Sequence, residues 1–480
     1  MTDVDVAHIE QSIDQEAVPP GTRADRMPTA ALIGLVAVGI VFRLLWSARN
    51  GASFDESFTA MIGRHSLSGV FDALRNGDSH PPLDYLMRAP LARMGAGDWG
   101  MRLPSLFFSA AALAIFAWWM RDRGVGGIVA VGLMAVSPFQ IMYGGEARMY
   151  ALLELLGVAA GMLAERWLRA PQRWHPAAVG GIVLLAVFDH VSGFLLAVGL
   201  LAVAGRRTGV VARRWRMAIG GALALWMVVW GTSFLAQASV THASWIDKTS
   251  FRSIGDALTQ LLTNQQGIVV LVVAAVSCGI VFVIADDRLL GRVLVCLGVL
   301  PTALAAMVGL FVPFFIVRTV TIAAWVPCLA VGALVERLWR HSRPFGVIAV
   351  LVTALAVIPA TFVFLDRHWE YDASVDQLVA VSRPGDVVAT IPDWYGPLVD
   401  WRVAVRVYGS ARPVELADLP SAHAVSLGEQ ARSGRAWILS FAEDHRTYPG
   451  LPRCAPDWTD GVTTVSCVRV PVARRRGTGH

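Results

Sequence analysis

The sequence predicts a polytopic α-helical membrane protein of about eleven transmembrane helices, followed by a small α/β domain outside the cytoplasm. Its 480 residues are 55% hydrophobic and only 16% charged, whereas about a quarter of the residues in a soluble domain carry a charge. Apolar segments long enough to approach or cross a bilayer recur from Thr29 onward. From residue 366 the chain becomes polar and rich in turn residues, which indicates a separate domain over 366–480.

The apolar segments define the membrane part of the chain, which we place at 29–365. The expected spans are 29–46, 101–120, 125–143, 150–163, 177–189, 193–205, 217–235, 267–284, 293–311, 316–335 and 345–364. Several are shorter than about 20 residues, so they must tilt or extend into their flanks. Residues 1–28 are mostly polar, and we expect a disordered cytoplasmic tail there, without a cleavable signal peptide.

Arginine placement predicts the orientation. If the N-terminus is cytoplasmic, the turns on the inside hold fifteen arginines, whereas the short turns outside hold only Arg148, Lys248, Arg252 and Arg318 as basic residues. Cytoplasmic loops carry such an excess of basic residues. We therefore expect a multi-pass protein of a bacterial cytoplasmic membrane, with the loop 48–100 and the tail outside. Because the arginines flank spans, the net charge of +5 gives no argument for nucleic acid.

The loop 48–100 is too long and too apolar to be a bare connector. Asp55 and Glu56 follow the first span at the membrane boundary, where an unused carboxylate is costly. Residues 58–62 and 70–74 read as short amphipathic helices on the membrane surface. Pro81 and Pro82 then form a rigid elbow that presents His80. Taken alone, His80 suits a structural hydrogen bond in a turn better than a functional role.

Five short segments together carry a family resemblance. They are Phe54-Asp55-Glu56-Ser57, His80-Pro81-Pro82-Leu83-Asp84-Tyr85, Arg102-Leu103-Pro104-Ser105, Ser137-Pro138-Phe139-Gln140 and Gly145-Glu146-Ala147-Arg148-Met149-Tyr150. In this order and spacing the chain resembles the C-type glycosyltransferase (GT-C) superfamily, in particular the bacterial relatives of protein O-mannosyltransferases and of the lipid A aminoarabinose transferase. The resemblance covers residues 29–318.

The resemblance implies an enzyme that moves a sugar from a polyprenyl-phosphate carrier to an acceptor outside the membrane. Mannose is the first expectation for the sugar and arabinose the next, and the acceptor is a glycolipid, a wall polysaccharide or a protein. Asp55 takes the family's position of general base, a role that typically accelerates such steps ~10²–10⁴-fold. The departing lipid phosphate needs cations. The candidates for binding it are Arg148, Arg318, Arg102 and His190.

Several alternatives stay open. Glu56 could act as a nucleophile and give retention instead of inversion. Arg102 could be an interfacial anchor, Arg148 could snorkel at a helix start or pair with Glu146, and His190 could merely cap a helix. Asp55, Glu56, His80 and His190 offer ligands that suit Mg, Mn or Zn, but their spacing does not settle whether a divalent cation binds. A transporter or flippase would also have many spans, but internal repeats are not visible.

Four further residues complete the expected positions. The candidates for positioning the acceptor or a covering loop are His80, Tyr85, Tyr150 and Trp245. Trp245 suits an aromatic membrane anchor equally.

In the tail, three segments are typical of strands: 386–391, 436–440 and 462–468. Cys454 and Cys467 lie there too, and an oxidising compartment favours a disulfide between them. No glycine motif for a nucleotide is evident, which fits a lipid-linked donor.

Overall fold

The computed structural model describes most of the membrane part and some segments of the tail. The described residues are 29–77, 80–238, 246, 248–263, 266–312, 314–366, 378, 381, 387–391, 415–416, 435–441, 453–459 and 463–469. The expected N-terminal tail over 1–28 lies outside them.

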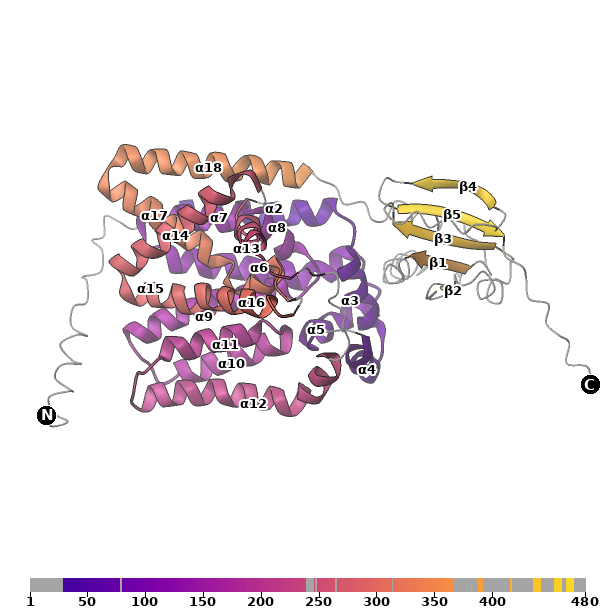
Figure 1. The fold of residues 1–480 in the computed structure, drawn as a ribbon, viewed down its shortest axis with the longest axis horizontal. Coiled ribbons are helices and arrows are strands. Elements are labelled where there is room, and N and C mark those ends of the chain that lie inside the picture. The colour runs from indigo at the N-terminus through magenta and orange to yellow at the C-terminus, as the bar shows by residue number, and fades with distance from the viewer. Residues whose placement is uncertain are drawn as a thin grey trace, which may run out of the picture.

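The described membrane part is helical throughout (Figure 1). In chain order the helices are α2 (Thr29–Arg49), α3 (Phe54–Arg64), α4 (Leu67–Gly77), α5 (Leu83–Arg93), α6 (Asp98–Met120), α7 (Gly124–Val136), α8 (Pro138–Gly145), α9 (Tyr150–Arg169), α10 (His175–Asp189), α11 (Gly193–Ala204), α12 (Val210–Ala238), α13 (Phe251–Gln260), η2 (Gln266–Ile268), α14 (Val269–Asp286), α15 (Arg288–Leu294), η3 (Val295–Val299), α16 (Leu300–Gly309), η4 (Val317–Ala323), α17 (Trp325–His341) and α18 (Arg343–Asp366).

The chain is a multi-pass membrane protein. Among the described residues, six helices are long and apolar enough to cross a membrane, or up to eight if two bent helix pairs each count as one span. All eleven expected segments are helical, but α10 and α11 are short, and α9 carries Glu154 and Glu165. These two acids are tolerated because α9 lies inside the bundle, with most of its side chains buried. The count of eleven spans stays a prediction.

Two expected spans are broken. The segment expected at 125–143 is α7 followed by α8, which meet at 52°. Pro138 begins α8, and since proline has no N–H to donate and crowds the preceding turn, the first helix ends before it. The segment expected at 316–335 is the 3-10 helix η4 and then α17, bent by 61°. Both breaks place polar residues in one region, next to the first-loop helix that begins at Phe54.

Glycines let α7 and α17 cross closely. A Cβ atom on Gly126 would run into the carbonyl oxygen of Gly332, and one on Gly332 would run into that of Gly126. Small residues at such a crossing allow the two backbones to touch, which is how helices gain packing energy in a bilayer.

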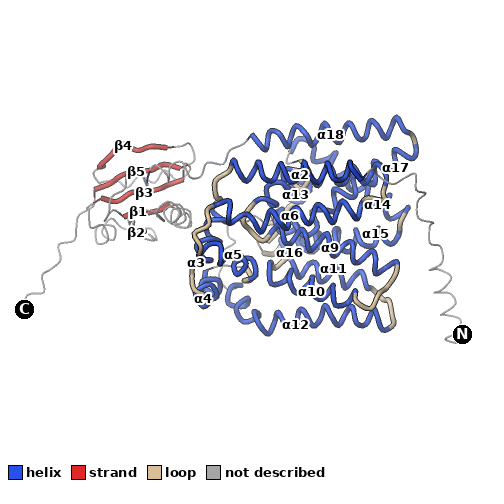
Figure 2. Tube along the Cα trace, turned by 180° about the vertical axis from the view of Figure 1, so that it is seen from behind, coloured by secondary structure: helices blue, strands red, loops and turns tan. Residues whose placement is uncertain are grey.

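The first loop forms three helices at one end of the bundle. α3 and α4 confirm the two amphipathic helices expected there, although both are longer. Figures 1 and 2 show α3, α4 and α5 together at the end of the bundle where α18 finishes, with the strands of the tail beyond it. Arg49, at the end of α2, donates from Nη1 to the carbonyl of Leu365 at 3.5 Å, which ties the ends of α2 and α18 together.

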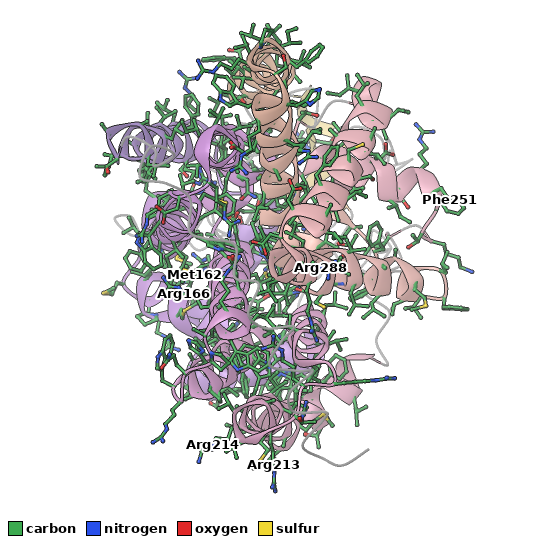
Figure 3. The ribbon with its side chains drawn as sticks, turned by 90° about the vertical axis from the view of Figure 1, so that its left-hand side faces the viewer. Met162, Arg166, Arg213, Arg214, Phe251 and Arg288 are labelled. Carbon is green, nitrogen blue, oxygen red and sulfur yellow. A yellow bond between two sulfur atoms is a disulfide. The ribbon has the colours of Figure 1, made fainter. Side chains whose placement is uncertain are left out.

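The opposite end of the bundle is basic. Figure 3 looks onto that end, where Arg166, Arg213, Arg214 and Arg288 lie. These residues belong to the arginine-rich turns expected on the cytoplasmic side.

The described part of the tail is a five-stranded sheet of order β2-β1-β3-β5-β4. The strands are β1 (Val387–Ile391), β2 (Glu415–Leu416), β3 (Arg435–Phe441), β4 (Arg453–Thr459) and β5 (Thr463–Arg469). β1 pairs in parallel with β2 and β3, and β5 lies antiparallel between β3 and β4. The three expected strands correspond to β1, β3 and β5.

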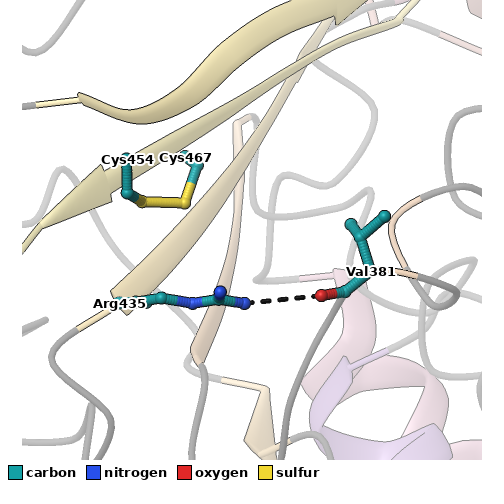
Figure 4. The surroundings of a disulfide bond; sticks show 4 residues. All are labelled: Val381, Arg435, Cys454 and Cys467. Carbon is teal, nitrogen blue, oxygen red and sulfur yellow. Dashed lines mark hydrogen bonds between the residues drawn. A yellow bond between two sulfur atoms is a disulfide. The ribbon is translucent and has the colours of Figure 1, made fainter.

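A disulfide joins the last two strands. Cys454 on β4 and Cys467 on β5 are bonded, with their Cα atoms 5.2 Å apart (Figure 4). Cys467 is buried and stands opposite Trp437 of β3. Arg435, at the start of β3, donates to the carbonyl of Val381 at 3.4 Å, as Figure 4 also shows. The disulfide therefore ties the edge strand β4 to its neighbour β5.

Candidate active site

The N-terminus of α3 brings two carboxylates into the protein. Ser53 caps the helix: its Oγ accepts the N–H of Glu56 at 3.3 Å, and its own N–H donates to Glu56 Oε2 at 2.8 Å. This reciprocal capping box fixes where α3 starts. Consequently Asp55 and Glu56 lie in the first helical turn but point to different surroundings.

Glu56 is held by a closed set of hydrogen bonds. Arg102 on α6 donates from Nε to Oε1 and from Nη2 to Oε2, both at 2.7 Å, a two-pronged geometry that only arginine offers. Ala147 N–H also donates to Oε1 at 2.7 Å. Burial alone would raise the pKa of Glu56, but Arg102 and these backbone donors outweigh it and hold the pKa below its usual range.

Arg102 uses all five of its N–H donors within the protein. Besides Glu56, it donates to the carbonyls of Ser47 and Asn50 at 2.8 and 2.7 Å and to that of Gly51 at 2.8 Å. These carbonyls lie where α2 ends and have no partner inside the helix. Arg102 therefore joins the end of α2 to the start of α3.

This geometry favours a structural role for Arg102 and Glu56 over the phosphate-binding and catalytic roles expected for them. Arg102 has no donor left for a lipid phosphate, and its side chain is fully buried. Glu56 cannot serve as a free nucleophile, since both its oxygens accept hydrogen bonds from Arg102 and the backbone. We assign the pair a structural role, which residue type and loop position could not reveal.

Asp55 faces the other two candidate arginines. Arg318 on η4 donates from Nη1 to Asp55 Oδ2 at 2.5 Å and reaches Tyr150 Oη at 3.4 Å. Arg148 donates from Nη1 to Thr59 Oγ1 at 2.7 Å, to Tyr85 Oη at 3.2 Å and to the carbonyl of Asp55 at 3.4 Å. Asp55 and Arg318 stay partly exposed, at 29% and 23%, so a ligand can reach this pair.

The electrostatics of Asp55 follow from these neighbours. Burial raises the pKa of Asp55, but Arg148, Arg318 and His80 outweigh burial and hold the pKa below its ordinary value. Asp55 is therefore ionised at neutral pH, as a proton acceptor must be.

A second ion pair positions Arg148. Arg88 on α5 binds Asp84 at 2.9 Å and donates to Ser105 Oγ at 2.7 Å and to the carbonyl of Arg148 at 3.1 Å. Arg88 is fully buried. Contacts from α5 and α6 thus fix the backbone of Arg148, and this positions its guanidinium group.

Aromatic rings border the Asp55–Arg318 pair. The ring of Tyr150 lies 6.3 Å from that of His190, and His190 lies 5.3 Å from His80, measured between centroids. Ser192 N–H donates to His190 Nδ1 at 3.0 Å; because an N–H can only donate, the proton of the neutral ring is on Nε2. The structure thus brings His80, His190, Tyr85 and Tyr150 to the same region as Asp55.

The four candidate metal ligands do not form one cluster. Within the described residues, no three His, Cys, Asp or Glu side chains come together to hold an ion. Glu56 is bound by Arg102, while the rings of His80 and His190 lie 5.3 Å apart between centroids. Trp245, expected in a covering loop, lies outside the described residues.

Glu146 is a site residue that the sequence reasoning considered only as a partner of Arg148. It lies in the turn between α8 and α9 and is 4% exposed. Ser53 Oγ donates to its Oε1 at 3.0 Å. Burial, with Glu56 and Asp55 nearby, raises its pKa to about 7, although Arg318 and Arg148 oppose the shift. Its place beside Arg148 in the motif was the available signal.

Solved structures with the same fold exist. The crystal structure of ArnT from Cupriavidus metallidurans bound to undecaprenyl phosphate matches with a TM-score of 0.58 at 13% identity, over 92% of this chain and 98% of that chain. The apo structure of the same protein matches with a TM-score of 0.56 over the same shares. The chain is therefore a polytopic helical membrane protein with an ArnT-like fold. No family model and no curated protein matches the chain.

Proposed function

We propose that the protein is a glycosyltransferase that moves a sugar from a polyprenyl-phosphate carrier to an acceptor outside the cytoplasmic membrane. The observation that carries this proposal is the group of Asp55, Arg148 and Arg318, which sets one reachable carboxylate against two arginines at the end of the bundle. A similar fold binds undecaprenyl phosphate in ArnT, which supports the carrier class.

The arginines suit the leaving group. As the glycosidic bond breaks, the lipid phosphate gains negative charge, and cations already aimed at that position lower the barrier. Arg318 is the more accessible, whereas Arg148 is buried and positioned through Arg88. Guanidinium groups can bind phosphate oxygens through two N–H donors at once.

The Asp55–Arg318 ion pair gives the donor a way to activate the base. A bound phosphate competes with Asp55 for Arg318. Once Arg318 turns to the phosphate, Asp55 loses the hydrogen bond and the nearby charge of Arg318, both of which lower its pKa. Asp55 then takes the proton of the acceptor hydroxyl, the hydroxyl oxygen bonds to the anomeric carbon, and the electron pair of the breaking bond goes to the phosphate oxygen.

A single displacement with inversion follows from this arrangement. Retention needs a second carboxylate as nucleophile, and the best sequence candidate, Glu56, is held by Arg102. Glu146 is nearly fully buried behind Ser53. Asp55 thus remains the carboxylate that an acceptor can reach.

The topology we propose has eleven spans, a cytoplasmic N-terminus, and the loop 48–100 and the tail outside. The basic end of the bundle, with Arg213 and Arg288, then faces the cytoplasm (Figure 3). The site lies among α3, the start of α9 and η4, at the end where a lipid headgroup and an external acceptor can meet.

Product analysis tests the proposal. Purified protein is given a panel of synthetic polyprenyl-phosphate sugars, mannose first and arabinose next, with glycolipid, polysaccharide and peptide acceptors. We expect one donor to be consumed and the anomeric configuration of the product, read by NMR, to be inverted. A product with retained configuration would refute the single displacement, and failure of every donor would refute the proposed reaction.

A further inference from the structure

Two glutamates in the site have opposite surroundings, although they lie close together. Glu56 receives four hydrogen bonds, two of them from a guanidinium. Glu146 receives one from the hydroxyl of Ser53, and within the described residues its Oε2 accepts none. Both are nearly fully buried. Burying an ionised carboxylate with so few hydrogen-bond donors costs free energy, so these surroundings favour the protonated form of Glu146.

The charged and titratable groups around Glu146 come from five elements and one turn. They are Asp55 and Glu56 on α3, Arg102 on α6, Tyr143 on α8, Arg148 in the turn before α9, Tyr150 at the start of α9, and Arg318 on η4. The two carboxylates disfavour a charge on Glu146, whereas Arg318 and Arg148 favour it, which with burial sets its pKa at about 7. In the protein without a bound phosphate, Glu146 is therefore protonated in some molecules and ionised in others near neutral pH.

A phosphate in the site changes this balance. It takes up the charge of Arg318 and Arg148, the same arginines that support ionised Glu146, and adds negative charge of its own. Both effects raise the proton affinity of Glu146. The donor is a phosphodiester with one negative charge, whereas the released carrier is a monoester with up to two.

We propose that Glu146 binds a proton when the carrier phosphate monoester occupies the site, and so balances the second negative charge of that phosphate. This inference rests on the proposed function. The chemistry balances: the acceptor hydroxyl loses one proton, the carrier gains one charge, and Glu146 holds one proton until the carrier leaves. Asp55 first accepts the hydroxyl proton and then gives it up to Glu146, so that Asp55 is ionised again and Glu146 holds the proton that matches the second charge of the carrier phosphate.

Calorimetry tests this without any transfer reaction. Farnesyl phosphate, in detergent with the full-length protein, is titrated at pH 6, 7 and 8 in pairs of buffers that differ in ionisation enthalpy, which reports protons taken up. At pH 8 we expect uptake to approach about one proton. The affinity should weaken by up to about tenfold per pH unit above pH 7. Farnesol, which has no phosphate, should cause no uptake.

The matched variant is Glu146→Gln, which keeps the shape and cannot titrate. In this variant, proton uptake on binding farnesyl phosphate at pH 8 should be lost. Its affinity for farnesyl phosphate should become nearly independent of pH above 7. Uptake equal to that of the unmodified protein would overturn the inference. If the variant does not fold, infrared difference spectra of the unmodified protein decide: farnesyl phosphate should add a protonated-carboxyl band at pH 8, and its absence would overturn the inference.

The outcomes also separate the two proposals. Binding of farnesyl phosphate without proton uptake would overturn this inference alone. Failure of the unmodified protein to bind the probe at all would overturn both the inference and the proposed carrier.

Discussion

Arg102 is a phosphate-binding candidate in the sequence, whereas its contacts in the structure favour a structural role. A buried arginine near a headgroup layer suits phosphate binding, and residue type alone cannot distinguish that role from another. The distinction comes from counting donors, because all five N–H groups of Arg102 already bind Glu56 and three carbonyls. Those contacts join residues about fifty positions apart, which no local pattern specifies.

The Glu56–Arg102 pair should stabilise the fold strongly. Removing one partner of a buried ion pair leaves the other charge unpaired and costs about 3–5 kcal/mol. We therefore expect Arg102→Gln to lower the thermal unfolding midpoint in detergent markedly. Arg340→Gln is the control, since its pair with Glu336 is largely exposed on the arginine side and is worth at most about 1 kcal/mol. Equal effects of the two substitutions would contradict the structural role.

Glu146 should make stability depend on pH near neutrality. Its pKa is raised from 4.5 to about 7, so between these values the folded protein keeps a proton that the unfolded chain has released. The free energy of unfolding should therefore fall as the pH rises from 4.5 to 7. The lowered pKa values of Asp55 and Glu56 act at more acidic pH, below the ordinary values of their carboxyl groups.

Unfolding midpoints at pH 5 and pH 8 measure this dependence. The unmodified protein should lose more stability between the two than Glu146→Gln, which has no carboxyl to titrate at this position. An identical loss in both proteins would show that other groups cause the dependence.

Arg148 should act on donor binding. A hydrogen bond to a charged group is worth about 1.5–3 kcal/mol, so Arg148→Ala should weaken the binding of a polyprenyl-phosphate sugar roughly 10–100-fold. Arg148→Lys keeps the charge without the fork and should recover part of the loss. Arg64→Ala, at the exposed end of α3, serves as the control. Unchanged donor affinity in Arg148→Ala would contradict the assignment.

At the scale of elements, long apolar segments and the charged turns between them predicted most of the helices. The expected spans and the two loop helices coincide with helices whose ends differ from the predicted ends by up to seven residues. The breaks were not predicted, although Pro138 marks one of them in the sequence. A continuous apolar segment does not show where a helix bends, because hydropathy indicates burial in lipid and carries no information on the direction of the helix axis. The bends bring η4 and the turn after α8 to α3, and hence Arg318 to Asp55.

The crossing of α7 and α17 provides a test of helix packing. Gly332→Ala adds a methyl group that meets the backbone of Gly126 and Ala130, so the helices must move apart and the unfolding midpoint should fall. Gly181→Ala on α10 meets nothing within 4 Å and should be neutral or slightly stabilising, because alanine is the better helix former. A fall of equal size in both variants would contradict the close crossing.

At the scale of the whole molecule, charge distribution predicts the orientation. In intact cells of cysteine-substituted proteins, an impermeant thiol reagent should label Ser68→Cys and Asp400→Cys and leave Thr208→Cys unlabelled. Thr208→Cys should become labelled once the cells are opened, which controls for accessibility. The reverse pattern would contradict the topology and, with it, the side on which transfer is proposed.

The disulfide of the tail depends on the same topology. Cys454 and Cys467 are bonded in the structure, and such bonds persist in oxidising compartments. Mass spectrometry of peptides from unreduced protein should show the two cysteines linked. Two free thiols in protein purified without reductant would place the tail on the reducing side or leave the bond unformed.

The most direct test of the whole account is the transfer rate of Asp55→Asn under saturating donor and acceptor. The substitution keeps the shape and removes the base, so transfer should fall at least ~10²-fold, while the donor, held by Arg148 and Arg318, should still bind. Asp72→Asn, an exposed acid on α4, should transfer at the unmodified rate. An Asp55→Asn protein that transfers sugar as fast as the unmodified protein would contradict the account.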